Sequence, residues 1–568
     1  MSRLCILKLL KMHVKLADWT NQREEMATEF EVFLNNYTIK RRHDQTMNPV
    51  DIETRRQLLF DDALTQSSYG FEPTMNPAIR HNQPLLLPEK PWERVAIWRW
   101  VSVMEDNGVY RMWYDAYSED PAGVFRWIPR LCYAESRDGV NWERPNLGVI
   151  EFEGSKNNNI VFEGIGNKQP VWSYTKLANG TMTYKPNFGA NGAVFKDPIA
   201  PAQQKYRYTF NDNHSPSYEV SSGGGRIYGA CSPDGIHWKV CKAGEPIIHW
   251  YHDGPPSCFW DDRIGKYVMY VRWDEGREFI NGKWEYPPSF EAAEKSLISS
   301  KDHEFVPAPL SPGLHCRAIG RTEGNDFENF PSPEKILSAD EHDDMNLGLY
   351  HSAAVKYPYA ENAYFLFPGA FYGEHRATPD TIDVQLATSR DGILFRRWRE
   401  SFVRLGMNGA FDSKMIDMGV GMVRRGNELL MYYGGSKFCH GETNPSMNPG
   451  LGGIGMVRIR VDGFVSQDAP ISGGILITKP VKFGSGSRLV VNMDGSANGT
   501  LKVDLLDEFC HPIGGFSGFD SDVLYGNDIN RLVTWKGSGD FAVLKGRPIR
   551  LRFSGKSVKL YAFQFIPE

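Results

Sequence analysis

The chain has 568 residues and a formal net charge of −5 at pH 7, from 64 Lys and Arg against 69 Asp and Glu. Hydrophobic residues make up 41% and charged residues 23% of the sequence, which is ordinary for globular proteins and excludes bulk disorder. The near-neutral charge balance argues against a protein that binds nucleic acid through phosphate contacts. Aromatic residues reach 13%, beside 55 Gly and 35 Pro, and this combination favours a turn-rich β protein.

The chain begins with a helical pattern in residues 1–46. Apolar residues at Leu4, Leu7, Leu10 and Val14 alternate with lysines and predict a short amphipathic helix, an N-terminal extension that could touch a membrane surface or a partner or lie outside the functional protein. The lysines argue against a signal peptide, so a cytoplasmic location is the default expectation. No apolar run reaches the roughly 18–20 residues of a transmembrane segment. The eight scattered cysteines are expected to be mostly reduced core thiols.

A turn phrase recurs along residues 47–468. It reads Ser-x-Asp-Gly-x-x-Trp or Phe and is found at 136–142, 232–238 and 389–395, with shorter versions at 322–327 and 461–464. Glycine tolerates positive φ and aspartate binds the local backbone, so each phrase predicts a tight turn. Short apolar strands precede each phrase. Five such units predict a five-bladed β-propeller, with one flat sandwich of many strands as the structural alternative.

Two strands of each unit are clearly marked by aromatic and β-branched residues. The predicted second strands are 110–117, 205–212, 266–273, 363–371 and 428–435, and the predicted third strands are 131–136, 227–232, 316–322, 384–389 and 453–459. After residue 468 the pattern changes to short alternating strands, so residues 469–568 are predicted to form a C-terminal β-sandwich. This sandwich could pack on the propeller edge, bind carbohydrate or mediate a homo-oligomer.

Carboxylates stand just before the first strand of four units. In a propeller the first strand of each blade is innermost, so Glu93, Asp253, Asp344 and Asp412 are expected to face a central pocket. Converging carboxylates differ in pKa, and a protonated and an ionised carboxyl together cleave a glycosidic bond. We therefore predict Asp253 as the general acid and Glu93 as the base or nucleophile. Asp344 and Asp412 are predicted to orient water or bind hydroxyl groups.

The neighbours of these carboxylates suit a sugar, which offers an apolar face and hydroxyl groups. The predicted substrate-binding residues are Trp92, Asn191, His252, Arg272, Asp343, Tyr350 and His351. Each acid also has a plain structural reading as a turn cap. No metal site and no cofactor is predicted, although clustered oxygen atoms are compatible with a structural Ca²⁺. The expected partner is an oligo- or polysaccharide.

A resemblance to a known family rests on the repeat layout and on four sequence features: the strand YRMWY, the runs LFDD (59–62) and PWE (91–93), and the closing run from 478–480 to 560–565. The chain resembles the five-bladed propeller glycoside hydrolases, the superfamily of families 32 and 43, and in particular bacterial proteins labelled glycosyl hydrolase family 32-like. The resemblance implies a blade-one acid at Glu93 and a blade-three acid at Asp253. The family's blade-two acid has no counterpart near Asn191, so sucrose and fructan are not the expected substrates.

Two other readings stay open. The missing blade-two acid is compatible with a non-catalytic sugar-binding propeller, and the same fold could carry a glycoside phosphorylase or transglycosylase. A phosphorylase would need a basic anion site, for which Lys185 and Arg272 are the candidates in the sequence.

Overall fold

The computed structural model describes residues 48–118, 128–165, 172–176, 182–186, 191–212, 225–252, 254–276, 278–280, 283–285, 315–344, 346–373, 380–440 and 450–567. Within these ranges the elements are β-strands and single 3₁₀ turns. The turns are η2 (Pro91–Glu93), η3 (Ala202–Gln204), η4 (Lys242–Gly244), η6 (Gly518–Asp520) and η7 (Ala542–Leu544). The predicted all-β class is confirmed. The predicted helical extension, 1–46, lies outside the described residues.

Three antiparallel sheets follow one another along the chain. The first sheet contains β6 (Ala96–Asp106), β7 (Val109–Ser118), β8 (Ile128–Ser136) and β9 (Ile160–Phe162). The second contains β12 (Asn191–Lys196), β13 (Tyr206–Asp212), β14 (Gly225–Ser232) and β15 (Lys239–Val240), with β16 (Ile248–His252) also on β14. The third contains β17 (Ser257–Asp261), β18 (Lys266–Gly276), β21 (His315–Gly324) and β22 (Glu334–Leu337). Two separate hairpins are β10 (Trp172–Lys176) with β11 (Met182–Pro186), and β19 (Glu278–Ile280) with β20 (Lys283–Glu285).

A fourth sheet has nine strands and consists of two sets of consecutive strands. We call each of these two sets, and each of the first three sheets, a run, which gives five runs. The first run is β23 (Leu347–Lys356), β24 (Tyr364–Tyr372), β25 (Thr381–Ser389) and β26 (Arg396–Val403). The second is β27 (Met415–Met418), β28 (Val423–Arg425), β29 (Glu428–Ser436), β30 (Gly453–Arg460) and β5 (Ile79–Arg80). A single parallel pair, Ile382 with Met415, joins the two runs. All the repeat strands predicted from the sequence coincide with strands of these four sheets.

The first strands of the five runs contact one another in a cycle. β6 contacts β12, β12 contacts β17, β17 contacts β23, β23 contacts β27, and β27 contacts β6. The Val194 amide, for example, donates to the Ser102 hydroxyl oxygen at 2.9 Å, and the Ser257 hydroxyl donates to the Ser352 carbonyl at 2.9 Å. Where these strands end, their residues line one cavity of about 1550 Å³. We call this the exit end, and the opposite end, where the five strands begin, the entrance end.

The turn phrases fasten each run to its neighbour. In three of them the glycine carbonyl accepts a hydrogen bond from an aromatic side chain on the second strand of the preceding run. The bonds run from Tyr432 to Gly139, from Trp113 to Gly235 and from Tyr270 to Gly392, at 2.8, 2.7 and 2.7 Å. Within the second phrase, burial raises the pKa of Asp234, but hydrogen bonds from His237 and Ile236 outweigh it and lower the pKa to about 2. The phrase aspartates are thus turn-forming groups, as their structural reading predicts.

Gly235→Ala is expected to weaken the fold more than Gly148→Ala does. Both glycines have positive φ, +79° and +72°, so both substitutions cost about 1–2 kcal/mol in backbone strain. An added Cβ at Gly235 would also lie 2.5 Å from Cζ2 of Trp113, whereas nothing lies within 4 Å at Gly148. The overlap should add about 1–3 kcal/mol. Urea unfolding followed by tryptophan fluorescence measures both losses, and equal losses would contradict the role of the Trp113 contact.

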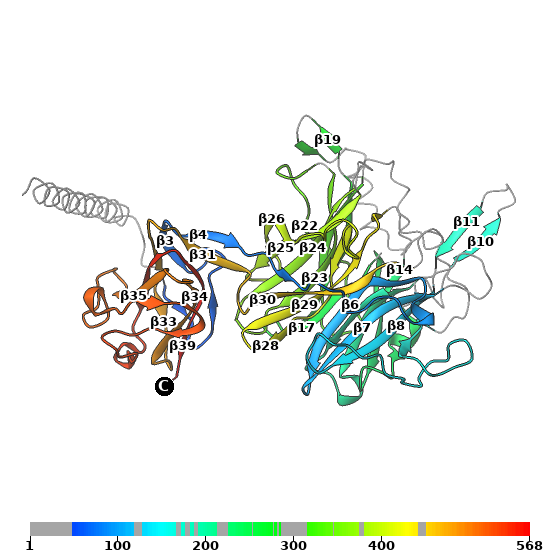
Figure 1. The fold of residues 1–568 in the computed structure, drawn as a ribbon, viewed down its shortest axis with the longest axis horizontal. Coiled ribbons are helices and arrows are strands. Elements are labelled where there is room, and N and C mark those ends of the chain that lie inside the picture. The colour runs from blue at the N-terminus through cyan, green and yellow to red at the C-terminus, as the bar shows by residue number, and fades with distance from the viewer. Residues whose placement is uncertain are drawn as a thin grey trace, which may run out of the picture.

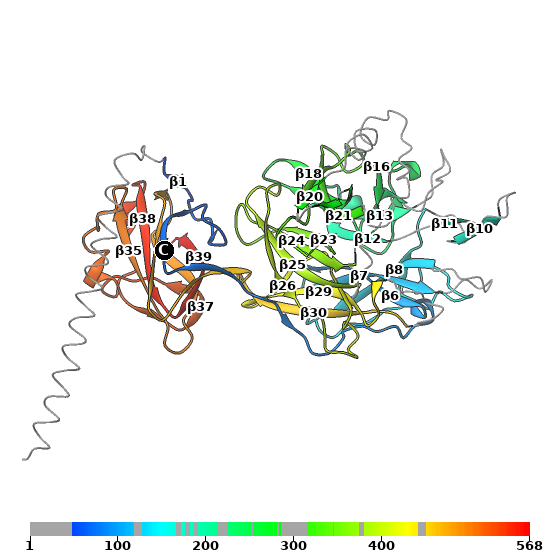
Figure 2. The ribbon, with the colours of Figure 1, turned by 90° about the horizontal axis from the view of Figure 1, so that it is seen from above.

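The remaining strands form two sheets that face a common apolar core. One sheet holds β1 (Val50–Asp51), β33 (Val481–Lys482), β38 (Ile549–Lys556), β32 (Gly474–Thr478), β3 (Thr65–Tyr69), β35 (Thr500–Asp507) and β36 (Leu524–Tyr525). The other holds β37 (Asn527–Leu532), β34 (Arg488–Asp494), β39 (Val558–Ile566), β31 (Val465–Ala469), β4 (Glu72–Met75) and β2 (Gln57–Leu58). Figures 1 and 2 show this pair of sheets as a separate body beside a larger body, which contains the five runs. We call it the C-terminal body.

The C-terminal body also includes the start of the described chain. The strands β1 to β4, within residues 50–75, pair with strands that lie between residues 465 and 566. The sequence places residues 50–75 in the first unit, 47–468, because these short strands carry no mark of their long-range partners. Their pairing ties both ends of the described chain into one body.

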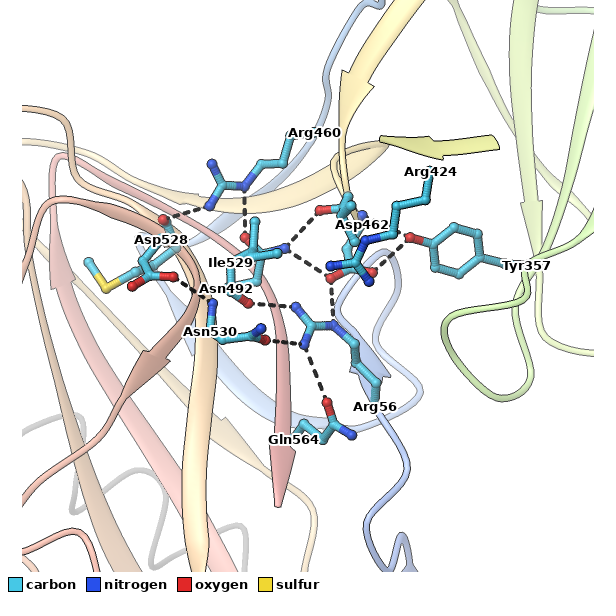
Figure 3. A network of polar contacts seen from close by, with 12 residues as sticks. Arg56, Tyr357, Arg424, Arg460, Asp462, Asn492, Asp528, Ile529, Asn530 and Gln564 are labelled. Atoms are coloured by element: carbon cyan, nitrogen blue, oxygen red, sulfur yellow. Dashed lines mark hydrogen bonds and ion pairs between the residues drawn. The ribbon is translucent and has the colours of Figure 1, made fainter. Parts of the chain in front are cut away.

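The two bodies meet at the fifth turn phrase (Figure 3). Asp462 is buried and accepts hydrogen bonds from Arg56 at 2.6 Å, from Asn492 at 2.9 Å and from the Tyr357 hydroxyl at 2.9 Å. Arg56 and Asn492 belong to the C-terminal body, whereas Tyr357 follows β23 in the larger body. A buried carboxylate with this many donors holds the two bodies together, because breaking one bond would leave a buried charge less well paired.

Candidate functional site

Two of the inner strands are bulged at the entrance end. On β6 the register with β7 shifts between Ile97 and Val101, and on β23 the register with β24 shifts between Leu349 and Ser352. Bulges bend a strand and re-aim its side chains, and they are frequent beside active sites. The residues between these register points are 98–100 on β6 and 350–351 on β23, and they are mostly aromatic. The entrance end is therefore where the inner strands depart from regular geometry.

The two bulges touch each other through Trp100 and His351. The ring centroids lie 4.3 Å apart with the ring planes at 76°. Both side chains are buried, and β6 and β23 belong to runs that are not neighbours in the contact cycle. Gly254, just before β17, lies against the same imidazole, since an added Cβ would be 2.1 Å from Cε1 of His351. Three runs thus converge on His351.

A buried carboxyl lies on the same level of the first sheet. Asp115 is on β7 opposite the β6 bulge, and its exposure is 1%. Neither of its oxygens has a well-formed hydrogen bond among the described residues. Burial raises the pKa of the Asp115 carboxyl well above its usual range, and the backbone amide of Gly192 offsets this only in part. A buried polar group of this kind calls for an explanation, and a catalytic acid is one of the standard ones.

The surroundings of Asp115 connect it to the bulges. The Tyr117 hydroxyl, two residues along β7, donates to the side-chain oxygen of Asn191, which precedes Gly192 on β12. The ring of Tyr117 in turn contacts the ring of Trp98 in the β6 bulge, with centroids 5.6 Å apart. Asn191 thus lies at the entrance end, as the sequence predicts, in contact with an aromatic residue of the first sheet.

A second carboxyl, Asp417, lies on β27 and is buried. An added Cβ at Gly369 would lie 3.2 Å from Oδ1 of Asp417 and 3.8 Å from the His351 carbonyl oxygen. Asp417 is therefore close to the backbone of His351. Together, Asp115, Asp417, Trp100 and His351 bring acids and aromatic rings to the entrance end.

Two arginines lie beside Tyr350, the residue that precedes His351 on β23. The Tyr350 ring is 3.7 Å from the His351 ring, and the guanidinium carbons of Arg272 and Arg317 lie 5.3 and 4.5 Å from the Tyr350 centroid. His440 Nε2 is 3.2 Å from the Tyr350 hydroxyl. Of the residues that the sequence predicts for substrate binding, Arg272, Tyr350 and His351 are thus brought together.

Glu93 lies elsewhere, inside the first sheet's own core. It belongs to η2, is fully buried, and accepts from the Glu89 and Lys90 amides at 3.0 and 3.1 Å. The Tyr114 hydroxyl donates to it at 2.7 Å, and the Arg144 guanidinium pairs with it at 3.0 Å. Every one of these contacts is structural.

Trp92, the residue before Glu93, is buried in the apolar cluster that also contains Tyr114. The side chains of Trp92 and Glu93 are both buried in η2, the 3₁₀ turn that precedes β6.

Two more predicted acids take structural positions. Asp344 is exposed, and its Oδ1 accepts from the Asn346 amide at 2.8 Å, which makes it a turn cap. Asp343 is ion-paired with Arg397 and Arg399.

Asp412 is also ion-paired. It accepts from the Tyr433 hydroxyl at 2.7 Å and lies 3.3 Å from Arg80 Nη1. Asp253 lies outside the described residues, as does the side chain of His252, so their predicted roles stay predictions.

The residues that sequence reasoning missed are Asp115, Asp417, Trp98, Trp100 and Arg317. Asp115 carried a usable signal, because it is the one acid in the run YRMWYDAY, whose other residues apart from Arg111 are aromatic or apolar. The consecutive large residues 98–100 likewise break the alternation of a regular strand. Asp417 and Arg317 carried no comparable signal.

Among the described residues, no group of three or more His, Cys, Asp and Glu is arranged to hold a metal ion, and no helix is long and apolar enough to cross a membrane. The cavity of about 1550 Å³ is at the exit end, away from these acids, and its charged groups include the ion pair of Arg55 with Glu361 at 2.5 Å. The chemistry-bearing residues therefore gather at the entrance end.

No family model matches the chain. It is 35% identical over 75 residues to 1,2-β-oligomannan phosphorylase of Thermoanaerobacter sp. (strain X514), which covers 13% of this chain and 25% of that protein. It is 26% identical over 174 residues to an uncharacterized protein of Mycobacterium tuberculosis (strain ATCC 25618 / H37Rv), covering 30% of this chain and 44% of the relative. The matches thus span less than half the length of these relatives.

Similar solved structures are carbohydrate-active enzymes. They include a glycosyl hydrolase from Bacteroides ovatus (TM-score 0.40, 15% identity, 67% of this chain and 94% of that one). A family 43 arabinoxylan arabinofuranohydrolase from Bacillus subtilis has a TM-score of 0.37 at 14% identity, over 87% and 99% of the two chains. β-1,2-Mannobiose phosphorylase from Listeria innocua has a TM-score of 0.37 at 12% identity, over 67% and 96%. These three structures are two glycoside hydrolases and a glycoside phosphorylase.

Proposed function

We propose that the chain is a carbohydrate-active enzyme that cleaves a glycosidic bond at the entrance end of a five-bladed β-propeller. The contact cycle of β6, β12, β17, β23 and β27 supports five blades around one axis. So do the cavity that these strands share and the turn phrases that fasten successive runs. In this proposal the C-terminal body is a β-sandwich, and no organic cofactor is needed.

The observation that carries this proposal is the buried carboxyl of Asp115 with its raised pKa. Cleavage of a glycosidic bond needs a carboxyl that is still protonated near neutral pH and can donate to the leaving oxygen. Burial in an aromatic environment produces this state, because the charged form loses its hydration. We therefore assign Asp115 the role of proton donor, in place of Asp253.

A second carboxylate must attack the sugar or activate the incoming nucleophile. We keep Asp253 for this role, because Gly254, the next residue, lies against His351 at the entrance end. Asp417, beside the His351 backbone, would orient the imidazole or bind a hydroxyl group. The rings of Trp98 and Trp100 offer the apolar faces on which a sugar ring packs.

The incoming nucleophile distinguishes two candidate reactions. Water would give hydrolysis, and inorganic phosphate would give phosphorolysis. Arg272 and Arg317, which both lie beside Tyr350, are the reason to consider phosphorolysis as well as hydrolysis. A phosphate nucleophile needs cationic donors near the reacting carbon. One of the relatives with a similar sequence is a phosphorylase of 1,2-β-oligomannan.

Product analysis on a panel of plant, algal and bacterial glycans, with and without inorganic phosphate, tests the proposed function. We expect release of a free sugar, or of a sugar phosphate only when phosphate is present. The control is Asp344→Asn, which removes the charge of an exposed turn carboxylate and should leave the rate unchanged. Glycan binding without any product from the wild-type protein would instead indicate a non-catalytic sugar-binding propeller.

A further inference from the structure

Two cysteines lie side by side on one face of the second sheet. Cys231 is on β14, and Cys241 follows β15, where its amide donates to the Gly229 carbonyl at 2.8 Å. Cys241 is therefore opposite Gly229, which precedes Cys231 by two residues on the same strand. Residues two apart on one strand, and residues that face each other across an antiparallel pair, share one face of the sheet. Cys231 and Cys241 are thus diagonal neighbours on that face.

The two thiols are hydrogen-bonded to each other. The bond that Cys241 donates to Cys231 lowers the pKa of the Cys231 thiol, against the effect of burial, and raises the pKa of the Cys241 thiol. Neither cysteine is in a disulfide, and their exposed fractions are 7% for Cys231 and 5% for Cys241. The thiols are therefore close enough to react with each other, and the pair is not fully closed to a small molecule.

The strands on either side of Cys231 carry cationic residues opposite it. Arg207 on β13 and Lys239 on β15 are its cross-strand partners. Both charges lower the pKa of the Cys231 thiol, and the charge of Glu328 raises it. Arg207 also pairs with Asp197 at 3.0 Å, so the hydrogen bond between the thiols is the main cause of the lowered pKa. A thiolate, and not a thiol, attacks an electrophile, and Cys231 is therefore the nucleophile of the pair.

A strained turn begins directly after Cys241. The three residues of η4, Lys242, Ala243 and Gly244, have φ values of +49°, +53° and +88°. Positive φ is unfavourable for residues other than glycine, and such strain is concentrated at functional sites and switch regions. The turn leads into β16, which ends two residues before Gly254 at the entrance end. A covalent bond from Cys241 to β14 would therefore hold the strained turn at the point where it leaves the sheet.

We propose that Cys231 and Cys241 are a site of reversible oxidation, at which hydrogen peroxide forms a disulfide that fixes η4 on β14. The Cys231 thiolate attacks one peroxide oxygen, the O–O bond breaks, and the departing hydroxide takes up the proton that the Cys231 thiol lost. Cys231 is thereby oxidised to a sulfenic acid. The Cys241 sulfur then attacks the Cys231 sulfur, the S–O bond breaks, and the departing hydroxide takes the Cys241 proton. Two thiols and one peroxide thus give one disulfide and two molecules of water.

Peptide mapping of the full chain tests the disulfide directly. Trypsin cleaves after Lys239, between Cys231 and Cys241, so the two thiols lie on the separate peptides 227–239 and 240–242. The protein is treated with hydrogen peroxide, its remaining thiols are alkylated, and the digest is analysed by mass spectrometry without reduction. We expect the two peptides to be joined after peroxide and to be separate again after dithiothreitol.

The matched control is Cys258, which belongs to the same apolar cluster as the pair. Its exposed fraction is 2%, and burial raises the pKa of its thiol well above the usual range. Cys231 should therefore react with peroxide at least about tenfold faster than Cys258. The variant Cys258→Ser should form the disulfide as the wild-type protein does. In Cys241→Ser, by contrast, the sulfenic acid of Cys231 should accumulate, and dimedone traps it.

Hydrogen exchange tests the effect of the disulfide on η4. The amides of Gly244 and Glu245 donate to the Cys241 and Lys242 carbonyls at 3.0 Å, and they should exchange more slowly in the oxidised protein. Unchanged exchange would overturn the fixing of the turn. Separate peptides after peroxide, or equal oxidation rates of Cys231 and Cys258, would overturn the oxidation site itself. These readouts follow thiols and amides in the wild-type protein, so they are independent of the proposed function and of whether a variant folds.

Discussion

Asp115→Asn is expected to lower kcat for glycan cleavage by about 10²–10⁴-fold, the usual contribution of a general acid. The asparagine has nearly the shape of a protonated carboxyl, so the aromatic surroundings and the Gly192 contact should persist. Only the transferable proton is lost. The rate of the wild-type enzyme should fall as the pH rises through the raised pKa of Asp115, because the donor is then ionised. The measurement is the initial rate on the best substrate from the glycan panel, as a function of pH.

The stability of the same variant gives an independent check. In the folded protein Asp115 keeps its proton at pH values where the unfolded chain has already lost it, so the native state binds more protons. The contribution of this group to stability therefore decreases as the pH rises above the ordinary carboxyl pKa. The asparagine side chain of the variant cannot titrate, so the Tm of the variant relative to wild type should increase from pH 4 to pH 8.

A matched control is available in the fourth sheet. Burial also raises the pKa of Asp383, but this residue lies on β25 and accepts a hydrogen bond from the Ser401 hydroxyl. Asp383→Asn should therefore leave kcat near the wild-type value. Equal losses of activity in the two variants would mean that buried carboxyl groups in general, and not Asp115 in particular, are needed. Full activity of Asp115→Asn would remove Asp115 from the mechanism.

The fold could be predicted from the sequence to the extent that local chemistry determines it. The Asp-Gly turns and the aromatic strands around them depend on neighbours within a few residues, and both were found where the sequence places them. Pairing between distant segments has no such local mark. The strands within residues 50–75 are short, and their sequence pattern does not indicate that they pair with strands between β31 and β39.

The candidate site was harder to predict, because the prediction used only the carboxylates that stand just before the first strand of each unit. That prediction assumes an extended chain leading into each inner strand, whereas a 3₁₀ turn precedes β6 and turns Glu93 inward. Asp412 is turned inward to Tyr433 in a comparable way. Asp115, whose pKa is raised, lies instead on the second strand of its sheet. It is recognised as a candidate by the bulge of β6 opposite it. Bulges arise from the register between strands, which a single sequence does not display.

Glu93→Gln is expected to lower the free energy of unfolding by about 3–5 kcal/mol, as is usual when one partner of a buried ion pair is removed. Both oxygens of Glu93 accept hydrogen bonds, two from backbone amides and one from Tyr114. A glutamine would place an N–H₂ group against one of these donors. It would also leave the charge of Arg144 without its buried partner. Urea unfolding of the full chain measures the loss.

Glu89→Gln is the matched control, because Glu89 pairs with the same arginine at 3.0 Å, but its side chain is 65% exposed. Exposed ion pairs contribute about 0–1 kcal/mol, so this variant should remain close to wild type. The contrast tests the structural position of Glu93 against its predicted role as base or nucleophile. If Glu93→Gln kept the wild-type stability and lost activity, Glu93 would act on the substrate. A large loss of stability, with the activity of the remaining folded protein preserved at low temperature, would establish that Glu93 holds the first sheet together and does not react with the substrate.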